Sequence, residues 1–508
     1  MYSLSPVNIK HLESLAFQQA GIPASELMEK AGAAVCQAAL RLAASAALDH
    51  FVILAGKGNN AGDAFVCARL LLAKGCRVSL FLTSSPEKLQ GEARTAFSHL
   101  RETLQQPFSQ ALTPDAFLEK TLIIDGLLGT GVKGTPKEPI ATWIKMANAS
   151  GCPILAIDLP SGLNADDGST DLAIIADYTV TFAVPKTGML LQKGPECCGR
   201  LEIADIGIPE NLLRDIPGDL EVFSGFEARQ VLRRENFTTY KNQRGHLGVI
   251  GGSSAYGQAP FLTAEAALRC GSGLCTVLYP KQAECWGTVP KAIIVRRIED
   301  AGKGYFNRFS LQEVSEQMKA FTVLACGPGM SCHADLLPVL ELLLSTGKPM
   351  VLDADALNLL SLAPELLKTP HAELLLTPHP GEMSRLLKAF RISPDLSRQE
   401  QTMALANATK STVVLKGCRS ITASCNGDCT MNLSGCAALA TAGSGDVLAG
   451  VCASFLGQQM SPFTAAALAV YVHGLTGEIL RPLGSRGILA DDLLAALPDA
   501  LQQISPIT

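Results

Sequence analysis

The sequence has little charge of either sign and no long apolar run. Charged residues make up 18% of its 508 residues, and the formal net charge is −5. Binding to nucleic acid or to an anionic membrane by electrostatics needs a basic surface, so the net charge gives no reason to expect either partner. No run of about 20 apolar residues occurs, and the first six residues lack a basic region followed by an apolar core. We therefore expect a cytoplasmic protein.

Spacings typical of metal sites and disulfide frameworks are also missing, although the chain has 16 cysteines. Most of these cysteines stand singly in apolar runs, and no Cys-x-x-Cys pair with histidines occurs. The two clusters, Cys197 with Cys198 and Cys425 with Cys429, do not offer four ligands at zinc spacing. We predict free thiols in a reducing compartment.

Apolar sequence for large cores is abundant, at 47% of the residues. The chain is too long for one typical core, so two large domains fit best. The pattern becomes polar and charged over residues 210–240, which places the boundary near residue 220 and predicts domains 1–220 and 221–508. The apolar content also suggests subunit contacts and a homo-oligomer, although two large cores could absorb the same residues.

Short apolar runs alternate with helical patterns in the first half. Such runs are typical of strands buried on both faces, and the alternation predicts βαβ units around a parallel sheet. In such sheets ligands bind beyond the carboxyl ends of the strands. The predicted strands cover residues 51–54, 78–82, 122–125 and 154–158, and the predicted helices cover residues 63–74 and 86–104.

Three of these predicted strands end in loops rich in glycine or polar groups. Residues 56–63 follow the first strand, Asp125 ends the third before residues 126–135, and Asp158 ends the fourth, shortly before Ser161. Taken singly, each loop is what any βα connection contains. Together, two acids, an amide and a hydroxyl could surround a hard cation, while the 129–135 loop and its lysine could hold phosphates.

A second βα series fills the other half of the chain. Each predicted strand is followed by a turn and a helical stretch, which indicates a second three-layer α/β unit. The predicted strands cover residues 247–252, 323–326, 350–353, 373–376 and 413–416, and three C-terminal helices are predicted over residues 438–456, 463–480 and 491–503.

The most informative segment is residues 439–450, where Gly443, Ser444, Gly445 and Asp446 precede an Ala/Leu-rich stretch. Glycines let successive amides converge on an anion, and the positive end of a helix adds to the attraction. Asp446 would repel a phosphate, so it suits a different role, that of the base that takes a proton from an attacking hydroxyl during phosphoryl transfer. The alternative is an ordinary helix N-terminus with an acidic first turn.

Two further loops of the second half carry polar groups. His379 stands on a turn between prolines, where it could contact a ligand or cap the loop. Residues 416–420 could hold a nucleotide phosphate or ribose, or form a tight connection between two strands.

As an ordered set, these motifs resemble two known families. The first half resembles the NAD(P)H-hydrate epimerases and the second the ADP-dependent NAD(P)H-hydrate dehydratases of the ribokinase-like group, in the order of the bacterial fused enzyme. The resemblance implies an α/β chain with a Rossmann-like three-layer αβα domain followed by a ribokinase-like αβα domain. The matching motifs are residues 58–63, the Asp125 loop and residues 158–162 in the first half, and residues 256–260, 327–329, 377–382 and 440–446 in the second.

The activity that the resemblance implies is repair of hydrated NADH and NADPH. The first domain would interconvert the R and S hydrates. The second would use ADP to phosphorylate the ring hydroxyl of the S hydrate, and loss of the phosphate would give NAD(P)H and AMP. The family pattern implies K⁺ in the first domain. Mg²⁺ is expected for any nucleotide phosphoryl transfer, although no ligand set for it is visible in the sequence.

Site residues follow from the same resemblance. Asp158 and Asp446 would be catalytic, and Asn60, Asp125 and Ser161 would bind potassium. The hydrated nucleotide would contact Asn59, Asn60, Ala61, Gly62, Asp63, Gly129, Thr130, Gly131, Val132, Lys133, Gly134, Thr135 and Asp158 in the first domain, and Ala259, Gly329, His379 and Asp446 in the second. ADP or AMP would contact Lys416, Gly417, Cys418, Arg419, Ser420 and Gly445.

The chain departs from the family pattern at four positions. Ala61 and Ala64 stand where glycine is common, and Ser444 stands where threonine is common. These three residues are small, so we expect them to be tolerated. Cys436 replaces a common asparagine and removes an amide near the phosphate cradle, which bears on nucleotide and Mg²⁺ binding.

Two other functions fit parts of the sequence. A kinase for a sugar or a vitamin alcohol would carry the same cradle and Asp446, with the first half as a regulatory domain. Alternatively, the first half could bind a nucleotide without catalysis. The sequence does not distinguish ADP from ATP, or NADH-hydrate from NADPH-hydrate.

Overall fold

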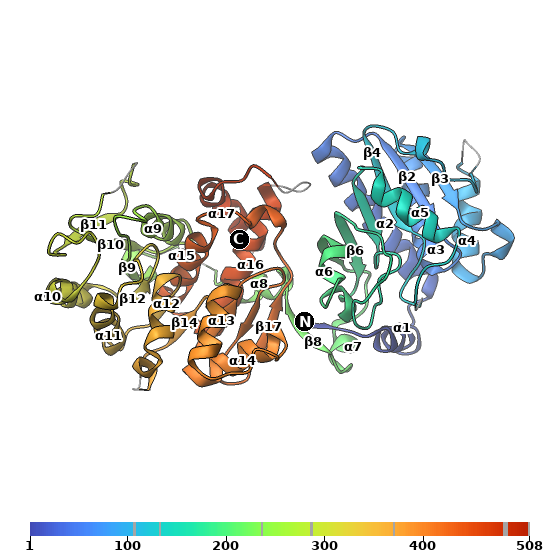
Figure 1. Cartoon of the computed structure of the whole chain (residues 1–508). Helices are drawn as coiled ribbons and strands as arrows, with labels where there is room; N and C mark the ends of the chain where they lie inside the picture. The colour runs from blue at the N-terminus through green and yellow to red at the C-terminus, as the bar shows by residue number, and fades with distance from the viewer. Residues whose placement is uncertain are drawn as a thin grey trace. The chain divides into compact units, whose positions relative to one another are not determined.

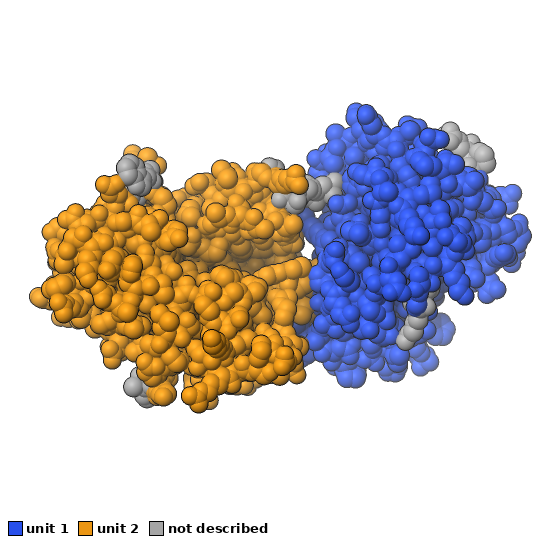
Figure 2. Space-filling view, in the orientation of Figure 1, with its two compact units in different colours: residues 1–221, 482–484 blue, residues 222–481, 485–508 orange. Residues whose placement is uncertain are grey.

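The computed structural model describes residues 1–104, 108–131, 134–234, 237–284, 288–368, 371–480 and 486–505. The chain divides into two compact units, of which unit 1 begins at Met1 and unit 2 begins at Val222 (Figures 1 and 2). Two predicted site residues, Val132 and Lys133, lie outside the described residues.

The sheet of unit 1 is parallel, with the strand order β3-β2-β4-β5-β6-β7. Every residue of β2 and β4 is buried, as expected for apolar runs covered on both faces. The four predicted strands are confirmed to within one residue at each end, whereas β6 and β7 were not predicted. The strands are β2 (His50–Ala55), β3 (Arg77–Leu82), β4 (Thr121–Gly126), β5 (Ile154–Ile157), β6 (Tyr178–Phe182) and β7 (Arg200–Ala204).

Helices cover both faces of this sheet. Phe51 and Ile53 of β2 point into a core formed with α2, α3 and α4, while Val52 and Leu54 point into a second core with α5. The short β1 (Tyr2–Ser3) pairs antiparallel with the first half of β8 (Leu220–Phe223). The helices are α1 (Pro6–Ala20), α2 (Ala24–Ala46), α3 (Asn59–Ala73), α4 (Gly91–Arg101), α5 (Ile140–Ala149), α6 (Gly194–Cys198) and α7 (Glu210–Arg214).

The sheet of unit 2 has the order β8-β17-β16-β15-β14-β13-β12-β9-β10-β11. It is parallel from β15 to β11, whereas β15, β16 and β17 pair antiparallel. The prediction of a turn and a helix after every strand is therefore wrong for β15, which continues into a hairpin. The strands are β9 (His246–Ile250), β10 (Leu274–Pro280), β11 (Ile294–Ile298), β12 (Val323–Cys326), β13 (Met350–Leu352), β14 (Leu374–Leu376), β15 (Thr412–Leu415), β16 (Ile421–Ala423) and β17 (Cys429–Asn432).

Two cores on opposite faces of this second sheet complete a three-layer unit. Val249 and Val323 face a core with α9, α15, α16 and α17, and Ile250 and Leu324 face a core with α10 to α14. The predicted α/β fold class is thus confirmed. The helices are α8 (Gly225–Val231), α9 (Ala259–Arg269), α10 (Leu311–Gln317), α11 (Leu337–Ser345), α12 (Asp355–Leu362), α13 (Pro380–Ala389), α14 (Arg398–Thr409), α15 (Ser444–Gly457), α16 (Pro462–Leu480) and α17 (Ala490–Ile504).

The helix of the phosphate cradle begins later than predicted. The prediction started it at residue 438, but α15 starts at Ser444, after a separate 3-10 turn over Ala437–Leu439. Gly443 has a φ of 83°, a left-handed conformation that suits glycine and separates the two elements. The glycine-rich motif therefore forms the first turn of α15, with its amides at the helix end.

Among the described residues, α16 is the helix whose length and apolar composition would allow it to span a membrane. In unit 2, however, 72% of its apolar window is buried, and the helix packs between α15 and α17. Core helices of soluble proteins pass the same length and composition test. The described cysteines are not joined in disulfides, which agrees with the predicted thiols.

Candidate active sites

The strand-end loops of unit 1 meet at one edge of its sheet. Gly56, after β2, approaches the loop after β4 so closely that a Cβ atom there would lie 1.9 Å from the carbonyl oxygen of Leu127. A Cβ on Gly129 would lie 3.4 Å from Cβ of Asn60. The predicted loops 56–63 and 126–131 are thus in contact.

Asp125 and Ser161 form the buried centre of this edge. Oδ2 of Asp125 accepts a hydrogen bond from the amide of Ser161 at 2.8 Å, and Oδ1 accepts one from the Ser161 hydroxyl at 2.6 Å. The Ser161 Oγ also accepts from the amide of Leu128 at 2.8 Å. Burial raises the pKa of Asp125 to about 6, and the hydrogen bonds from Ser161 and Leu127 oppose that rise.

Asn60 supplies a third oxygen to the same edge. Its Nδ2 donates to the carbonyl oxygen of Leu128 at 2.8 Å. Its Oδ1 is buried and has no hydrogen-bond partner among the described residues. This unpaired amide oxygen lies at the loops that hold the Asp125 carboxylate and the Ser161 hydroxyl. Together the three groups form a set of oxygen donors that suits a hard, weakly charged cation. These three residues therefore fit the predicted potassium site.

Asp158 follows β5 in a left-handed conformation, with a φ of 61°. Its carboxylate forms an ion pair with Lys186, and Oδ1 also accepts from the Thr181 hydroxyl at 3.3 Å. The Lys186 side chain is only 2% exposed, against 17% for Asp158. This lysine was not predicted as a site residue. It lies four residues after β6, a strand that was not predicted either.

A third acid of unit 1, Asp63, is buried in α3. Burial raises its pKa well above the usual value, and the negative charges of Asp158 and Glu13 add to the rise. Asp63, Asp158 and Lys186 therefore share one electrostatic environment.

The other residues predicted around this site differ in exposure. Ala61 and Gly62 are buried in the first turn of α3, whereas Asn59 is exposed. Gly131, Gly134 and Thr135 are exposed and Thr130 is half-buried. Thr135 donates to Asp171 at 2.7 Å, outside the Asp125 cluster.

In unit 2, Asp446 lies half-buried in the first turn of α15. Burial raises its pKa to about 7, and the neighbouring carboxylate of Asp353 raises it further, while the charge of Lys416 lowers it. A carboxyl that titrates near neutral pH can exchange a proton with a substrate at that pH.

Lys416 and Asp353 stand next to this helix end. Nζ of Lys416 lies 2.7 Å from Oδ1 of Asp353, which also accepts from the Thr377 hydroxyl at 2.8 Å. A Cβ atom on Gly445 would lie 3.6 Å from Nζ of Lys416 and 3.9 Å from Oδ2 of Asp353. Burial lowers the pKa of Lys416, but the carboxylates of Asp353 and Glu382 outweigh it, so the net change is upward and the lysine stays charged.

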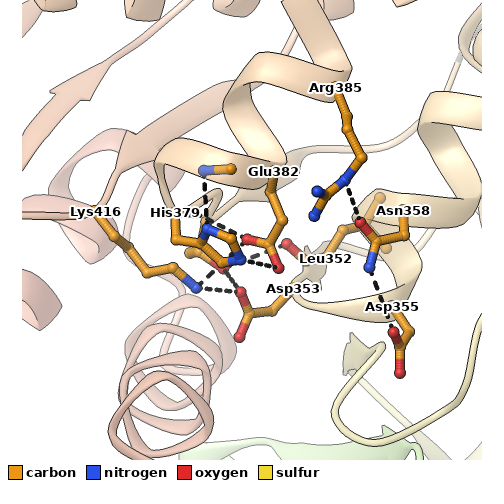
Figure 3. Close-up of polar contacts among 10 residues, drawn as sticks. Leu352, Asp353, Asp355, Asn358, His379, Glu382, Arg385 and Lys416 are labelled. Atoms are coloured by element: carbon orange, nitrogen blue, oxygen red, sulfur yellow. Dashed lines mark hydrogen bonds and ion pairs between the residues drawn. The ribbon is translucent and has the colours of Figure 1, made fainter. Parts of the chain in front are cut away.

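His379 and Glu382 complete this cluster from the N-terminus of α13 (Figure 3). The His379 amide donates to Oε2 of Glu382 at 2.8 Å, and the His379 Nδ1 accepts from the amide of Gly381 at 3.0 Å. Glu382 is buried, with Oε2 3.9 Å from Nζ of Lys416, and burial raises its pKa to about 7 despite that lysine. The histidine caps α13 and faces the cluster, so its capping role is confirmed, and its contact with a ligand stays a prediction.

Ala259 and Gly329 are also neighbours, as predicted for one substrate site. A Cβ on Gly329 would lie 3.1 Å from Cβ of Ala259 and 2.4 Å from the carbonyl oxygen of Tyr256. The Gly329 loop is tied to α12, because the Ser331 amide donates to Oδ2 of Asp355 at 2.8 Å.

Residues 416–420 form the connection between the antiparallel strands β15 and β16. The prediction of a tight connection between two strands is thus confirmed. Nucleotide binding by the same residues stays a prediction. The Ser420 hydroxyl donates to the carbonyl oxygen of Gly417 at 3.0 Å. The Arg419 side chain is buried and donates to the carbonyl oxygen of Leu433, so its guanidinium supports the hairpin.

Ser444, at the start of α15, contacts a buried histidine on α16. Its Oγ lies 3.1 Å from Nε2 of His473 on α16, and burial lowers the pKa of His473 to about 4. A Cβ on Gly477 would lie 3.3 Å from Sγ of Cys436, so that thiol packs toward α16.

Neither Asp353 nor Glu382 was predicted as a site residue. Asp353 ends a predicted strand, which is the signal that identified Asp125 and Asp158. Among the described residues, no group of three or more His, Cys, Asp or Glu side chains is arranged to hold a metal ion. A dedicated Mg²⁺ ligand set is therefore not visible in that part of the chain.

Comparison with known proteins divides the chain into two matching parts. Residues 247–499 match the family model described as NAD(P)H-hydrate dehydratase, and residues 24–188 match the one described as YjeF-related protein N-terminus. The bifunctional NAD(P)H-hydrate repair enzyme of Moorella thermoacetica is 37% identical, over 99% of this chain and 97% of its own length. That of Escherichia coli K12 is 33% identical, over 96% of this chain and 92% of its own length.

A solved structure is also similar to one part of the chain. The ADP/ATP-dependent NAD(P)H-hydrate dehydratase of Bacillus subtilis, co-crystallized with ATP and Mg²⁺, is 23% identical, covers 56% of this chain and 99% of its own, and has a TM-score of 0.47. The curated relatives exceed 30% identity over almost the full length, and the two family models match in the order that the motifs predict. The chain belongs to the family of bifunctional NAD(P)H-hydrate repair enzymes.

Proposed function

We propose that the chain restores hydrated NADH and NADPH in two steps. Domain 1–220 interconverts the R and S hydrates, and domain 221–508 dehydrates the S hydrate with ADP, releasing NAD(P)H, AMP and phosphate. The observation that carries this proposal is Asp446, whose pKa is raised to about 7 at the N-terminus of α15, beside the Lys416–Asp353 ion pair. Similarity to bifunctional repair enzymes over nearly the whole chain supports the pairing of the two steps.

In the dehydration step, Asp446 is the base. It accepts the proton of the ring hydroxyl as the hydroxyl oxygen attacks the terminal phosphorus of ADP, and AMP leaves. The amides of the first turn of α15 and the charge of Lys416 stabilise the transferred phosphoryl group. The phosphate then departs with the C–O electron pair, and loss of a proton from the neighbouring carbon forms the double bond. Phosphate is a far better leaving group than hydroxide.

Substrate and nucleotide are assigned to two sides of this base. Ala259, Gly329 and His379 hold the hydrated nucleotide next to Asp446. Gly445 and the 416–420 connection hold the nucleotide coproduct. Mg²⁺ would accompany ADP and neutralise phosphate charge.

In the epimerisation step, Asp158 takes the proton of the ring hydroxyl as the bond from the hydroxyl-bearing carbon to the ring nitrogen breaks, which leaves an aldehyde and puts the electron pair on the nitrogen. The nitrogen then adds to the other face of the carbonyl, and Asp158 returns the proton to the oxygen. Lys186 fixes the position of the Asp158 carboxylate through the buried ion pair. Asn60, Asp125 and Ser161 would hold potassium, which would supply positive charge at the loops that bind the nucleotide phosphates. The loops 59–63 and 129–135 hold the substrate against Asp158.

Product stoichiometry tests the dehydration step directly. Purified S hydrate and ADP are incubated with the full chain, and NADH, AMP and phosphate are quantified by chromatography. The proposal predicts one AMP and one phosphate for each NADH formed. An alcohol phosphorylated stably, with no NADH, would favour the small-molecule kinase instead.

A further inference from the structure

Arg385 stands at the edge of the cluster in unit 2 with no assigned role. It lies on α13, one turn beyond Gly381 (Figure 3). A Cβ atom on Gly381 would lie 2.8 Å from Cε1 of His379 and 3.9 Å from Nη1 of Arg385. The imidazole and the guanidinium therefore flank the same glycine. Burial lowers the pKa of His379 and raises that of Glu382, and the charge of Arg385 lowers both values, less than Lys416 does.

A chain of hydrogen bonds fixes the guanidinium. Nε of Arg385 donates to Oδ1 of Asn358 at 2.9 Å, and Nδ2 of Asn358 donates to Oδ1 of Asp355 at 3.4 Å. The other oxygen of Asp355 accepts from the Ser331 amide at 2.8 Å, two residues after Gly329. The orientation of Arg385 is thereby tied to the loop that carries Gly329.

The terminal nitrogens of Arg385 are left for a ligand. In the described part of the chain, no carboxylate lies within 4.0 Å of this guanidinium, and the side chain is exposed. Other arginines on helices differ, since Arg214 and Arg269 pair with a glutamate one turn earlier. A guanidinium held through Nε presents Nη1 and Nη2 as a planar pair of donors, the geometry that binds phosphate oxygens bidentately.

We propose that Arg385 binds the pyrophosphate of the hydrated dinucleotide in unit 2, with Asn358 as its positioning residue. This assignment rests on the proposed dehydration of that substrate. The substrate is favoured over ADP because Arg385 is linked to His379 and to the Gly329 loop. In Figure 3, Lys416, on the side assigned to ADP, and Arg385 lie on opposite sides of Glu382.

Steady-state dehydration by the full chain tests this assignment, with the S hydrate and ADP each varied while the other is saturating. Arg385→Gln is expected to raise KM for the hydrate about tenfold to a hundredfold, as for a lost charge-assisted hydrogen bond. The expected kcat and KM for ADP stay within about threefold of wild type. Arg385→Lys keeps the charge but loses the planar pair of donors, so its KM for the hydrate is expected to lie between those of wild type and Arg385→Gln.

Two further variants separate binding from structure. Asn358→Ala is expected to raise KM for the hydrate several-fold without lowering kcat, because it releases the guanidinium without removing it. Lys388→Gln, an exposed cation on the same helix, is the matched control and leaves both KM values unchanged. Circular dichroism melting confirms that each variant is folded.

Three results would overturn the assignment: an unchanged KM for the hydrate in Arg385→Gln, a rise confined to KM for ADP, or a fall in kcat alone. Absence of dehydration by the wild-type chain would instead contradict the proposed function. In that case the proposed pyrophosphate site is tested by measuring NADH binding to the full chain by calorimetry. Weaker binding by Arg385→Gln than by wild type supports the pyrophosphate site, and equal binding excludes it.

Discussion

Nζ of Lys416 lies 2.7 Å from Oδ1 of Asp353, and both side chains lie next to Gly445 at the first turn of α15. This ion pair joins a hairpin turn, the end of β13 and a helix N-terminus, which come from three distant segments. It places a positive charge where a phosphoryl group would meet Asp446. The pair is thus expected to matter for both stability and catalysis.

Removal of Lys416 tests how much the ion pair contributes to stability. The side chains of Lys416 and Asp353 are 17% and 3% exposed. Lys416→Met leaves the Asp353 carboxylate buried without its cation, which should lower the unfolding free energy of unit 2 by about 3–5 kcal/mol. Denaturant unfolding measures this change. The double variant with Asp353→Asn should recover part of the stability but none of the activity, and wild-type stability in Lys416→Met would contradict the account.

Asp446→Asn tests the proposed base. The amide has a similar shape but cannot accept the hydroxyl proton, so dehydration of the S hydrate should fall about a hundredfold to ten-thousandfold. The thermal unfolding midpoint should stay close to that of wild type. Wild-type turnover by this folded variant would exclude Asp446 as the base.

The pH dependence of dehydration follows from the same carboxyl. Its pKa is raised to about 7, mainly by burial, and a base acts only when it is deprotonated. The rate should therefore rise as pH increases through about 7 and level off above that value. Initial rates in buffers from pH 5 to 9 would show this, with about a tenfold rise for each pH unit well below 7. A rate that falls as pH rises through 7 would require a different group.

Asp158→Asn separates the two activities. It should abolish interconversion of the R and S hydrates, because the variant loses the proton-accepting group paired with Lys186. Dehydration of purified S hydrate should be unaffected. Chromatography of the isomers and NADH formation measure the two steps separately. Loss of both activities would argue against separate sites, and unchanged epimerisation would favour a non-catalytic first domain.

Much of this fold could be predicted, because continuous apolar runs mark strands buried on both faces. The strands that escaped prediction have mixed patterns. In β6, Thr179 and Thr181 interrupt the apolar run, and both are buried because their hydroxyls have partners, the carbonyl oxygen of Cys198 and the Asp158 carboxylate. In β11, Arg296 and Arg297 are exposed at the edge of the sheet.

The site residues also divide into those that local sequence reveals and those that it does not. Glycines and acids at strand ends could be found because they end or directly follow continuous apolar runs in the sequence. Lys186 and Arg385 could not be found this way, since their roles depend on partners that only the fold brings near. Potassium binding, the homo-oligomer and the cytoplasmic location stay predictions.

The most direct test of the central claim is recovery of NADH from a mixture of both isomers of its hydrate. The full chain is incubated with ADP, with ATP and with neither, in buffer containing potassium and magnesium. The account predicts complete, ADP-dependent recovery, because the R hydrate is converted as the S hydrate is consumed. Recovery that stops at the S fraction would contradict epimerisation by the first domain, and no recovery under any condition would contradict the repair function.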